Sequence, residues 1–173
     1  LVPFGEFMPL RPLLGPLAKA FQVPMSDFSS GVAKRPLLQV GPHRAGVSIC
    51  YEDAFAAEVV QALPDAAYLI NVSNDAWFGD SLAPHQHLGI ARMRALENGR
   101  PLLRATNTGI SAIIDHRGRI QGQVPAFERG FFSGEIQPRA GQTPFARVGN
   151  YLAIGLAWVL LGLAAFLMLR MRH

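Results

Sequence analysis

The chain has 173 residues and a formal net charge of +4, and 50% of its residues are hydrophobic while only 16% are charged. This length allows about one domain with a proper core. The basic residues form no stripe interleaved with aromatic side chains, which argues against a nucleic-acid partner, and the single cysteine excludes an internal disulfide.

The first 31 residues are rich in proline, glycine and phenylalanine. This composition predicts a long loop that helps to form a site, with one short helix at about residues 17–21. The chain opens on Leu1, in the middle of an apolar phrase, and not on a methionine. We therefore expect a processed or excised piece of a longer protein, or a sequence that lacks its beginning.

Apolar strand-like runs alternate with two helix-like segments through the middle of the chain. Asp53 is a plausible N-cap for the first helix, in which Phe55, Val59 and Leu63 share one face before Pro64 ends it. The strands are almost entirely apolar, which predicts an α/β layered fold with helices covering the sheet. The predicted strands are residues 36–40, 45–50, 67–72, 102–106, 111–114, 120–124 and 131–136, the predicted helices are residues 54–63 and 84–97, and residues 137–150 form a linker.

Residues 151–169 contain no charged side chain, and Arg170 and Arg172 follow them directly. A helix of this length covers about 28 Å, close to the hydrocarbon thickness of a bilayer, so the segment predicts a transmembrane helix. The two arginines favour a cytoplasmic tail at residues 170–173, although Arg147 weakens the charge contrast. Residues 1–150 would then form a domain on the periplasmic side of the inner membrane in a Gram-negative bacterium.

Cys50 ends an apolar strand-like run and is followed at once by Tyr51, Glu52 and Asp53. A thiol at the mouth of a strand, facing a turn with two carboxylates, is typical of a nucleophile. The alternative is a small buried hydrophobic residue, because free cysteine is among the most buried residue types. Glu52, closest to the thiol, favours a functional role, whereas Asp53 favours the role of a helix cap.

His85 and His87, with Asp80 nearby, raise the question of a metal site. On a helix, side chains two positions apart do not face each other, so this pair makes a poor chelate. We therefore expect no metal site here, and nothing else in the sequence indicates a cofactor.

Two other groups of side chains have more than one interpretation. Arg92, Arg94 and Glu97 fit a solvated helix face with an Arg94–Glu97 ion pair, and arginines lining a cleft are the alternative. Trp77 and Phe78 fit either the core or an exposed lid that faces lipid.

Several phrases in this sequence closely resemble the nitrilase, or carbon–nitrogen hydrolase, superfamily. Within it, SNDAWFG followed by an apolar terminal span resembles the membrane N-acyltransferases of lipoprotein maturation, and the resemblance covers essentially the whole chain. It implies the C-terminal part of a nitrilase-like αββα sandwich followed by one transmembrane helix. The phrases are VPFGE at residues 2–6, ICYE at 49–52, NVSNDAWFG at 71–79, RMRALE at 92–97 and RATNTG at 104–109.

The resemblance implies a Glu-Lys-Cys triad in which Cys50 is the nucleophile. Glu6 matches a further active-site glutamate, which would orient the lysine or the incoming amine. The backbone N–H of Tyr51 would help to bind the oxyanion, and Glu52 and Trp77 would support the site.

Two members of the implied triad, the base glutamate and the lysine, match nothing in this chain. Lys19 and Lys34, its only lysines, lie downstream of Glu6, where the family has no catalytic lysine. We expect both missing residues upstream of residue 1, and we expect the chain by itself to be inactive.

The implied reaction moves an acyl chain from a phospholipid to the cysteine, and then to the α-amino group of an apolipoprotein's diacylglyceryl-cysteine. The implied partners are the phospholipid donor, the diacylated apolipoprotein acceptor and the membrane. Two alternatives stay open: a nitrilase-type amidase acting on small amides, and an inactive membrane-anchored piece that only binds lipid or a partner. The apolar terminal span argues against the amidase, because such amidases are mostly soluble.

Overall fold

The computed structural model of the chain describes residues 37–171. The predicted N-terminal loop, its short helix and Glu6 therefore lie outside the described residues, as do Lys19 and Lys34.

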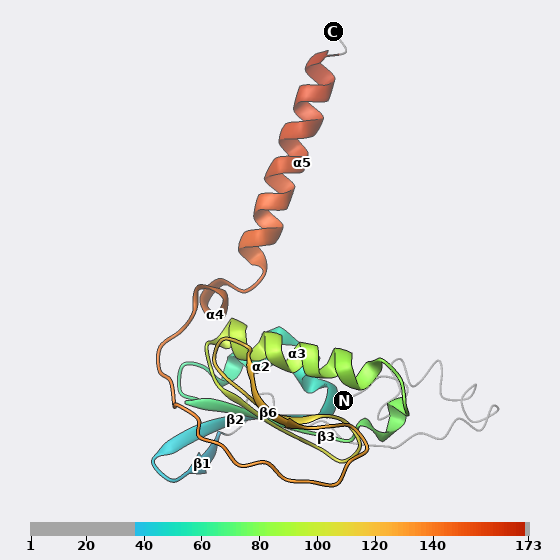
Figure 1. Cartoon of the computed structure of the whole chain (residues 1–173). Helices are drawn as coiled ribbons and strands as arrows, with labels where there is room; N and C mark the ends of the chain where they lie inside the picture. Colours follow the sequence, from blue (N-terminus) through green and yellow to red (C-terminus); the bar gives the residue numbers. More distant parts are fainter. Residues whose placement is uncertain (1–36, 172–173) are drawn as a thin grey trace, which may run out of the picture.

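The described part is built on one six-stranded sheet whose strands follow the order of the sequence, β1-β2-β3-β4-β5-β6 (Figure 1). The three middle strands β2, β3 and β4 are parallel, and β1, β5 and β6 pair antiparallel at the two sides. The carboxyl ends of the parallel strands consequently meet at one edge of the sheet, which we call the carboxyl edge. The strands are β1 (Leu38–Val40), β2 (His43–Ile49), β3 (Tyr68–Ser73), β4 (Leu102–Thr106), β5 (Ser111–Ile114) and β6 (Ile120–Val124).

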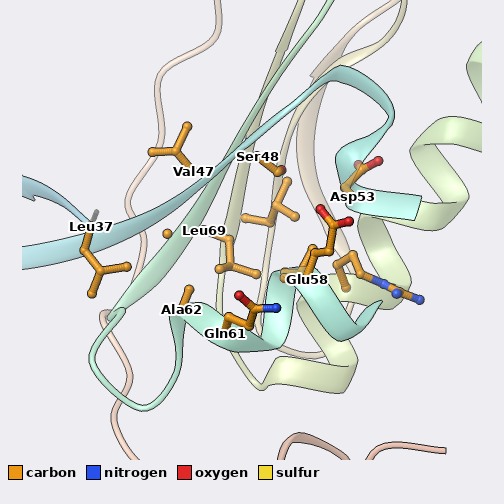
Figure 2. Close-up of a pocket in the computed structure, with 12 residues that line it drawn as sticks. Leu37, Val47, Ser48, Asp53, Glu58, Gln61, Ala62 and Leu69 are labelled. Carbon is orange, nitrogen blue, oxygen red and sulfur yellow. The ribbon is translucent and has the colours of Figure 1, made fainter. Parts of the chain in front are cut away.

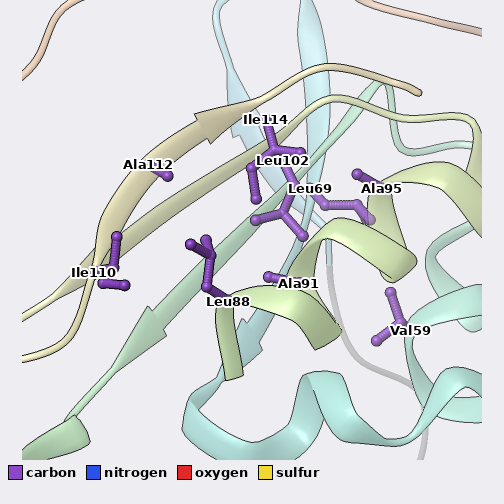
Figure 3. Packing of buried hydrophobic residues seen from close by; sticks show 9 residues of the cluster. All are labelled: Val59, Leu69, Leu88, Ala91, Ala95, Leu102, Ile110, Ala112 and Ile114. Carbon is purple, nitrogen blue, oxygen red and sulfur yellow. The ribbon is translucent and has the colours of Figure 1, made fainter. Parts of the chain in front are cut away.

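The long helix α3 (Ala83–Asn98) lies across one face of the sheet and forms the core with it (Figure 3). Ala91 and Ala95 of this helix are fully buried, and their small side chains let the helix approach the strands closely. They meet Leu102 and Ile114, which are among the largest fully buried side chains of the described residues. The helix ends at Gly99, whose φ of 60° is a left-handed conformation that glycine adopts without strain.

The opposite face of the sheet is open among the described residues. Neighbouring strands place Ile49 beside Val72 and Val47 beside Ile70 on this face. Ile49 is 61% exposed and Val72 is 41% exposed. The described residues thus supply one helix layer and one sheet layer, which is half of the four-layer arrangement that the resemblance implies.

Most of the predicted elements are confirmed. The strands expected at 102–106, 111–114 and 120–124 have the predicted ends, and the other strands through residue 73 and the helix α3 differ by a few residues. The hairpin between β5 and β6 is confirmed, with Gly118 at a φ of 75° in its turn.

Two predicted elements are wrong. The single helix expected at 54–63 is divided into the 3₁₀ turn η1 (Cys50–Ala54), the short helix α2 (Ala56–Val59) and the 3₁₀ turn η2 (Val60–Ala62). No strand forms at 131–136, because this segment packs the Phe132 ring against Gly122 of β6 and does not pair its backbone. A Cβ atom at Gly122 would lie 2.0 Å from that ring.

Arg100 fastens the linker to the domain. Its buried guanidinium donates to the carbonyl oxygens of Ala66, Pro64 and Gly141, the last at 2.7 Å. The Thr143 hydroxyl also donates to the carbonyl oxygen of Glu97 at the end of α3. The Arg139 N–H donates to the Ala67 carbonyl oxygen, so residues 139–143 are bound to the domain before the chain leaves it.

The chain continues through the short helix α4 (Pro144–Val148) into the long helix α5 (Tyr151–Met171), which stands away from the domain (Figure 1). Residues 151–168 have a mean hydropathy of 2.2 and none of them is buried. The helix is long and apolar enough to cross a membrane, as the sequence predicted.

Candidate active site

Cys50 occupies a strained turn at the carboxyl edge of the sheet, directly after β2. Its φ is 53°, a left-handed conformation that is uncommon for any residue with a side chain. Among the described residues other than glycine, only Phe127 shares this feature. The backbone N–H of Ile49 donates to Glu52 Oε2 at 2.7 Å across the turn. Such strain persists only where surrounding contacts determine the conformation, and it is frequent at active sites.

A row of polar side chains crosses the sheet beneath this turn. Ser48 of β2 is the register partner of Asn71 in β3, which in turn is the partner of Arg104 in β4. All three are buried. Asn71 Nδ2 donates to Ser48 Oγ at 3.1 Å and to the carbonyl oxygen of Cys50 at 3.2 Å, while Asn71 Oδ1 accepts from Arg104 Nη1. The row therefore connects the third parallel strand with the backbone of Cys50.

Four ionisable side chains form what we call the charge cluster: Asp53, Asp75, His87 and Arg104. His87 Nδ1 lies 2.9 Å from Asp75 Oδ1, and His87 Nε2 lies 3.0 Å from Asp53 Oδ1. Arg104 binds the other oxygen of each carboxylate, with Nη2 at 2.9 Å from Asp75 and Nη1 at 3.5 Å from Asp53. None of the four side chains is more than 3% exposed, and two cationic groups face two carboxylates.

The protonation of His87 follows from this geometry. Burial disfavours its charged form, but the hydrogen bonds with Asp53 and Asp75 outweigh burial and raise the pKa of His87 from 6.5 to about 9. Burial also opposes ionisation of Asp75, whose pKa nevertheless falls to about 2 because His87 and Ser73 donate to it and Arg104 lies nearby. At neutral pH both ring nitrogens of His87 therefore carry protons and donate.

The loops that follow β3 and β4 meet at Asp75. Ser73 Oγ donates to Asp75 Oδ1 at 2.6 Å, and the Asp75 backbone N–H donates to Asn107 Oδ1 at 3.2 Å. Gly109 makes room for the carboxylate, since a Cβ atom there would lie 2.1 Å from Asp75 Oδ2. The charge cluster thus joins the loops after all three parallel strands.

The fold and the site agree with what comparisons with known proteins show. The model of the family described as carbon-nitrogen hydrolase matches residues 7–145, which is most of the chain. The chain belongs to the carbon–nitrogen hydrolase family. Among solved structures, an amidase from Nesterenkonia sp. is 19% identical, with a TM-score of 0.51 over 76% of this chain and 49% of the amidase. This likeness shows the fold.

Curated relatives of this carbon–nitrogen hydrolase carry the name apolipoprotein N-acyltransferase. The protein of Methylococcus capsulatus is 53% identical over 94% of this chain and 32% of its own length. The protein of Nitrosomonas europaea is 48% identical over 96% of this chain and 34% of its own length. The chain therefore spans about a third of the length of these relatives.

Two expectations about the polar residues of this carbon–nitrogen hydrolase are wrong. Asp53 does not cap a helix. Its carboxylate points into the domain, where His87 and Arg104 donate hydrogen bonds to it and replace those that water would make. The face that carries Arg92, Arg94 and Glu97 is solvated only in part, because Arg92 is exposed while Arg94 is 9% exposed and lines a cavity. The ion pair itself is confirmed, at 3.0 Å.

His87 was singled out only as half of a possible chelate with His85. The structure separates the two, with His85 exposed and His87 in the charge cluster. Both ring nitrogens of His87 face carboxylates. Within residues 37–171 no group of three His, Cys, Asp or Glu side chains is arranged to hold a metal ion.

Two exposed aromatic side chains lie in the turns that follow β2 and β3. Trp77, in the 3₁₀ turn η3 (Asp75–Phe78), is 81% exposed, which excludes the core interpretation for this residue. Tyr51 is 41% exposed, and its ring meets the Phe55 ring edge to face at 5.8 Å. Phe78 instead packs against the His87 ring, with centroids 6.3 Å apart.

A cavity lies beside the charge cluster, between β2 and α2 on the helix-covered side of the sheet (Figure 2). Ser48, Asp53 and Glu58 contribute to its polar lining, and Val59 and Leu69 to its apolar lining. Cys50 is not among the lining residues. The cavity therefore contacts the Cys50 turn through Asp53 and not through Cys50 itself.

The raised pKa of His87 predicts a specific pH dependence of stability. A group whose pKa is about 9 when folded and 6.5 when unfolded stabilises the fold fully below pH 6.5, and this contribution is lost as the pH rises through 9. The loss is about 3 kcal/mol from this group alone. We expect His87→Gln to flatten the decline of the thermal midpoint between pH 6.5 and 9, while His85→Gln at the exposed position leaves it unchanged. Equal declines in wild type and His87→Gln would contradict the assignment.

Gly109 predicts a second difference in stability. In Gly109→Ala the new methyl group meets the Asp75 carboxylate, so we expect a loss of about 1–3 kcal/mol, as is typical of overpacking. Gly89→Ala is the matched control, because a Cβ atom there meets nothing within 4 Å and alanine favours the helix. Thermal midpoints of the two variants should move in opposite directions. A Gly109→Ala midpoint at or above that of wild type would show that Asp75 is free to move.

Proposed function

We propose that this carbon–nitrogen hydrolase takes part in N-acyl transfer, with Cys50 as the nucleophile. The acyl chain would pass from a phospholipid to Cys50, and then to the α-amino group of an apolipoprotein's N-terminal S-diacylglyceryl-cysteine. The observation that carries the proposal is the strained, partly exposed turn that holds Cys50 at the carboxyl edge. The names of the relatives supply the class of acceptor.

The reaction divides into two balanced steps. The Cys50 thiol loses its proton to a base, and the thiolate attacks the ester carbonyl, forming a thioester and releasing the lysophospholipid, whose oxygen takes up a proton. The acceptor's amine then attacks the thioester, forms the amide, loses a proton and releases the thiol. In each step a tetrahedral oxyanion needs donors, and the Tyr51 backbone N–H is the donor that we assign from the described residues.

The other roles follow the family resemblance. We propose that Glu6 orients the lysine or the incoming amine, and that Glu52 supports the site beside the nucleophile. The base glutamate and the lysine would come from outside this chain, as the sequence led us to expect. Expressed alone, the chain should therefore not turn over substrate, and this stays a prediction.

A lipid substrate is supported by two exposed aromatic side chains. Tyr51 is 41% exposed and Trp77 is 81% exposed, and they lie in the turns that follow β2 and β3. We propose that Trp77 contacts the acyl chain or the membrane surface. The helix α5 favours this function over hydrolysis of small soluble amides, because it would hold the site beside a bilayer.

The nucleophile assignment is tested by Cys50→Ser in the protein expressed from its complete gene. We expect loss of acyl transfer, because a serine hydroxyl without a strong base is a far weaker nucleophile than a thiolate. Mass spectrometry of wild type incubated with phospholipid should find a hydroxylamine-sensitive acyl adduct on Cys50. An adduct on a different residue, or full activity in the serine variant, would refute the assignment.

We also propose that the Cys50 domain and the C-terminal tail lie on opposite sides of the inner membrane, with the domain in the periplasm. In a Cys50→Ser background without other reactive cysteines, a membrane-impermeant maleimide added to intact spheroplasts should label Glu128→Cys, an exposed position of the domain. It should label His173→Cys only after permeabilisation. Labelling of position 173 in intact spheroplasts would overturn the topology.

A further inference from the structure

We propose that the charge cluster is a positioning device for the nucleophile: His87 and Arg104, through Asp53 and Asn71, hold both ends of the Cys50 turn. This proposal rests on the proposed role of Cys50. It assigns His87, Asp53, Arg104 and Asn71 a function in catalysis without contact with substrate.

The two ends of the turn have separate attachments. At its start, the carbonyl oxygen of Cys50 accepts from Asn71 Nδ2 at 3.2 Å. Three residues later, the carboxylate of Asp53 accepts from His87 Nε2 at 3.0 Å and from Arg104 Nη1 at 3.5 Å. Arg104 Nη1 also donates to Asn71 Oδ1, so one guanidinium joins both attachments.

The turn needs such attachments because its conformation is unfavourable by itself. A residue with a side chain held in the left-handed region costs on the order of 1–3 kcal/mol. The backbone of Cys50 at a φ of 53° would otherwise relax toward an extended conformation and carry the thiol with it. A shift of about 1 Å in a reacting atom can reduce a rate by about 10²-fold.

The imidazole of His87 serves two different loops. Its Nε2 side holds Asp53 in the Cys50 turn, and its Nδ1 side holds Asp75 in the loop after β3. The groups that face it are Asp53 from η1, Asp75 and Phe78 from η3, and Arg104 from β4. If His87 were only structural, losing the Nδ1 donor and losing the Nε2 donor would affect the rate of reaction at Cys50 equally. If it positions the nucleophile, losing the Nε2 donor to Asp53 lowers that rate more.

Two substitutions separate the sides. In His87→Asn the amide nitrogen takes the place of Nδ1, which keeps a donor for Asp75 and removes the donor for Asp53. In His87→Gln the amide nitrogen takes the place of Nε2, which keeps the donor for Asp53. His85→Asn is the control on the same helix, because His85 is exposed.

Three measurements are made on each variant of the protein expressed from its complete gene. They are the single-turnover rate of Cys50 acylation by phospholipid, the rate of Cys50 alkylation by iodoacetamide, and the thermal midpoint. We expect the thermal midpoints of both His87 variants to fall. The rates of acylation and alkylation should fall about 10²-fold in His87→Asn, a loss at least ten times larger than in His87→Gln. His85→Asn should match wild type.

Equal losses of rate in the two His87 variants, or alkylation of His87→Asn at the wild-type rate, would overturn the positioning role. If wild type forms no acyl adduct, the proposed function fails, but the alkylation ratio still tests the positioning role. If His87→Asn does not fold, Asn71→Asp replaces it. That variant keeps the oxygen that accepts from Arg104 and removes the donor to the Cys50 carbonyl. We again expect alkylation to fall about 10²-fold, and an unchanged rate would overturn the proposal.

Discussion

The paired charges of Asp53, His87, Asp75 and Arg104 are the interaction on which the carboxyl edge of the sheet depends. Taking four ionisable groups out of water is costly, and the cost is offset only because each charge meets an opposite charge at hydrogen-bonding distance. Removing one partner from such an arrangement typically costs 3–5 kcal/mol. The loops after β2, β3 and β4 all contribute to or contact this cluster, so none of them can move independently.

The sequence predicted the sheet well because most of its strands are short apolar runs with clear ends. The failures came where tertiary contacts override local pattern. Periodicity after Asp53 indicates one helix, yet the inward turn of that carboxylate draws residues 50–54 into a separate 3₁₀ turn. Residues 131–136 have the composition of a strand, but the Phe132 ring occupies the space above Gly122.

The sequence predicted the nucleophile of the candidate site but not the charge cluster beneath it. Cys50 stood out by its position, whereas the charge cluster was missed because its members lie far apart in the sequence. A signal was present: Ser48, Asn71 and Arg104 are polar residues inside otherwise apolar strands, and each occupies the same level of the sheet. Polar side chains that recur in buried parallel strands imply a partner network, since an unpaired buried polar group is costly. The family resemblance includes Asn71, Asp75 and Arg104 in its phrases, but it assigns them no role.

The binding of residues 139–143 by Ala67, Arg100 and Glu97 leaves very little free chain between the domain and α5. Arg139 N–H donates to the Ala67 carbonyl oxygen at 3.0 Å, and α4 follows almost at once. Only Gly149, at a φ of 56°, and Asn150 separate α4 from the apolar helix. If α5 stands in a bilayer, these two residues act as a short hinge. The domain can tilt over the lipid surface but cannot move far from it. The height of the Cys50 turn above the headgroups is then set by the fold, so any lipid that reaches the thiol would have to rise out of the bilayer.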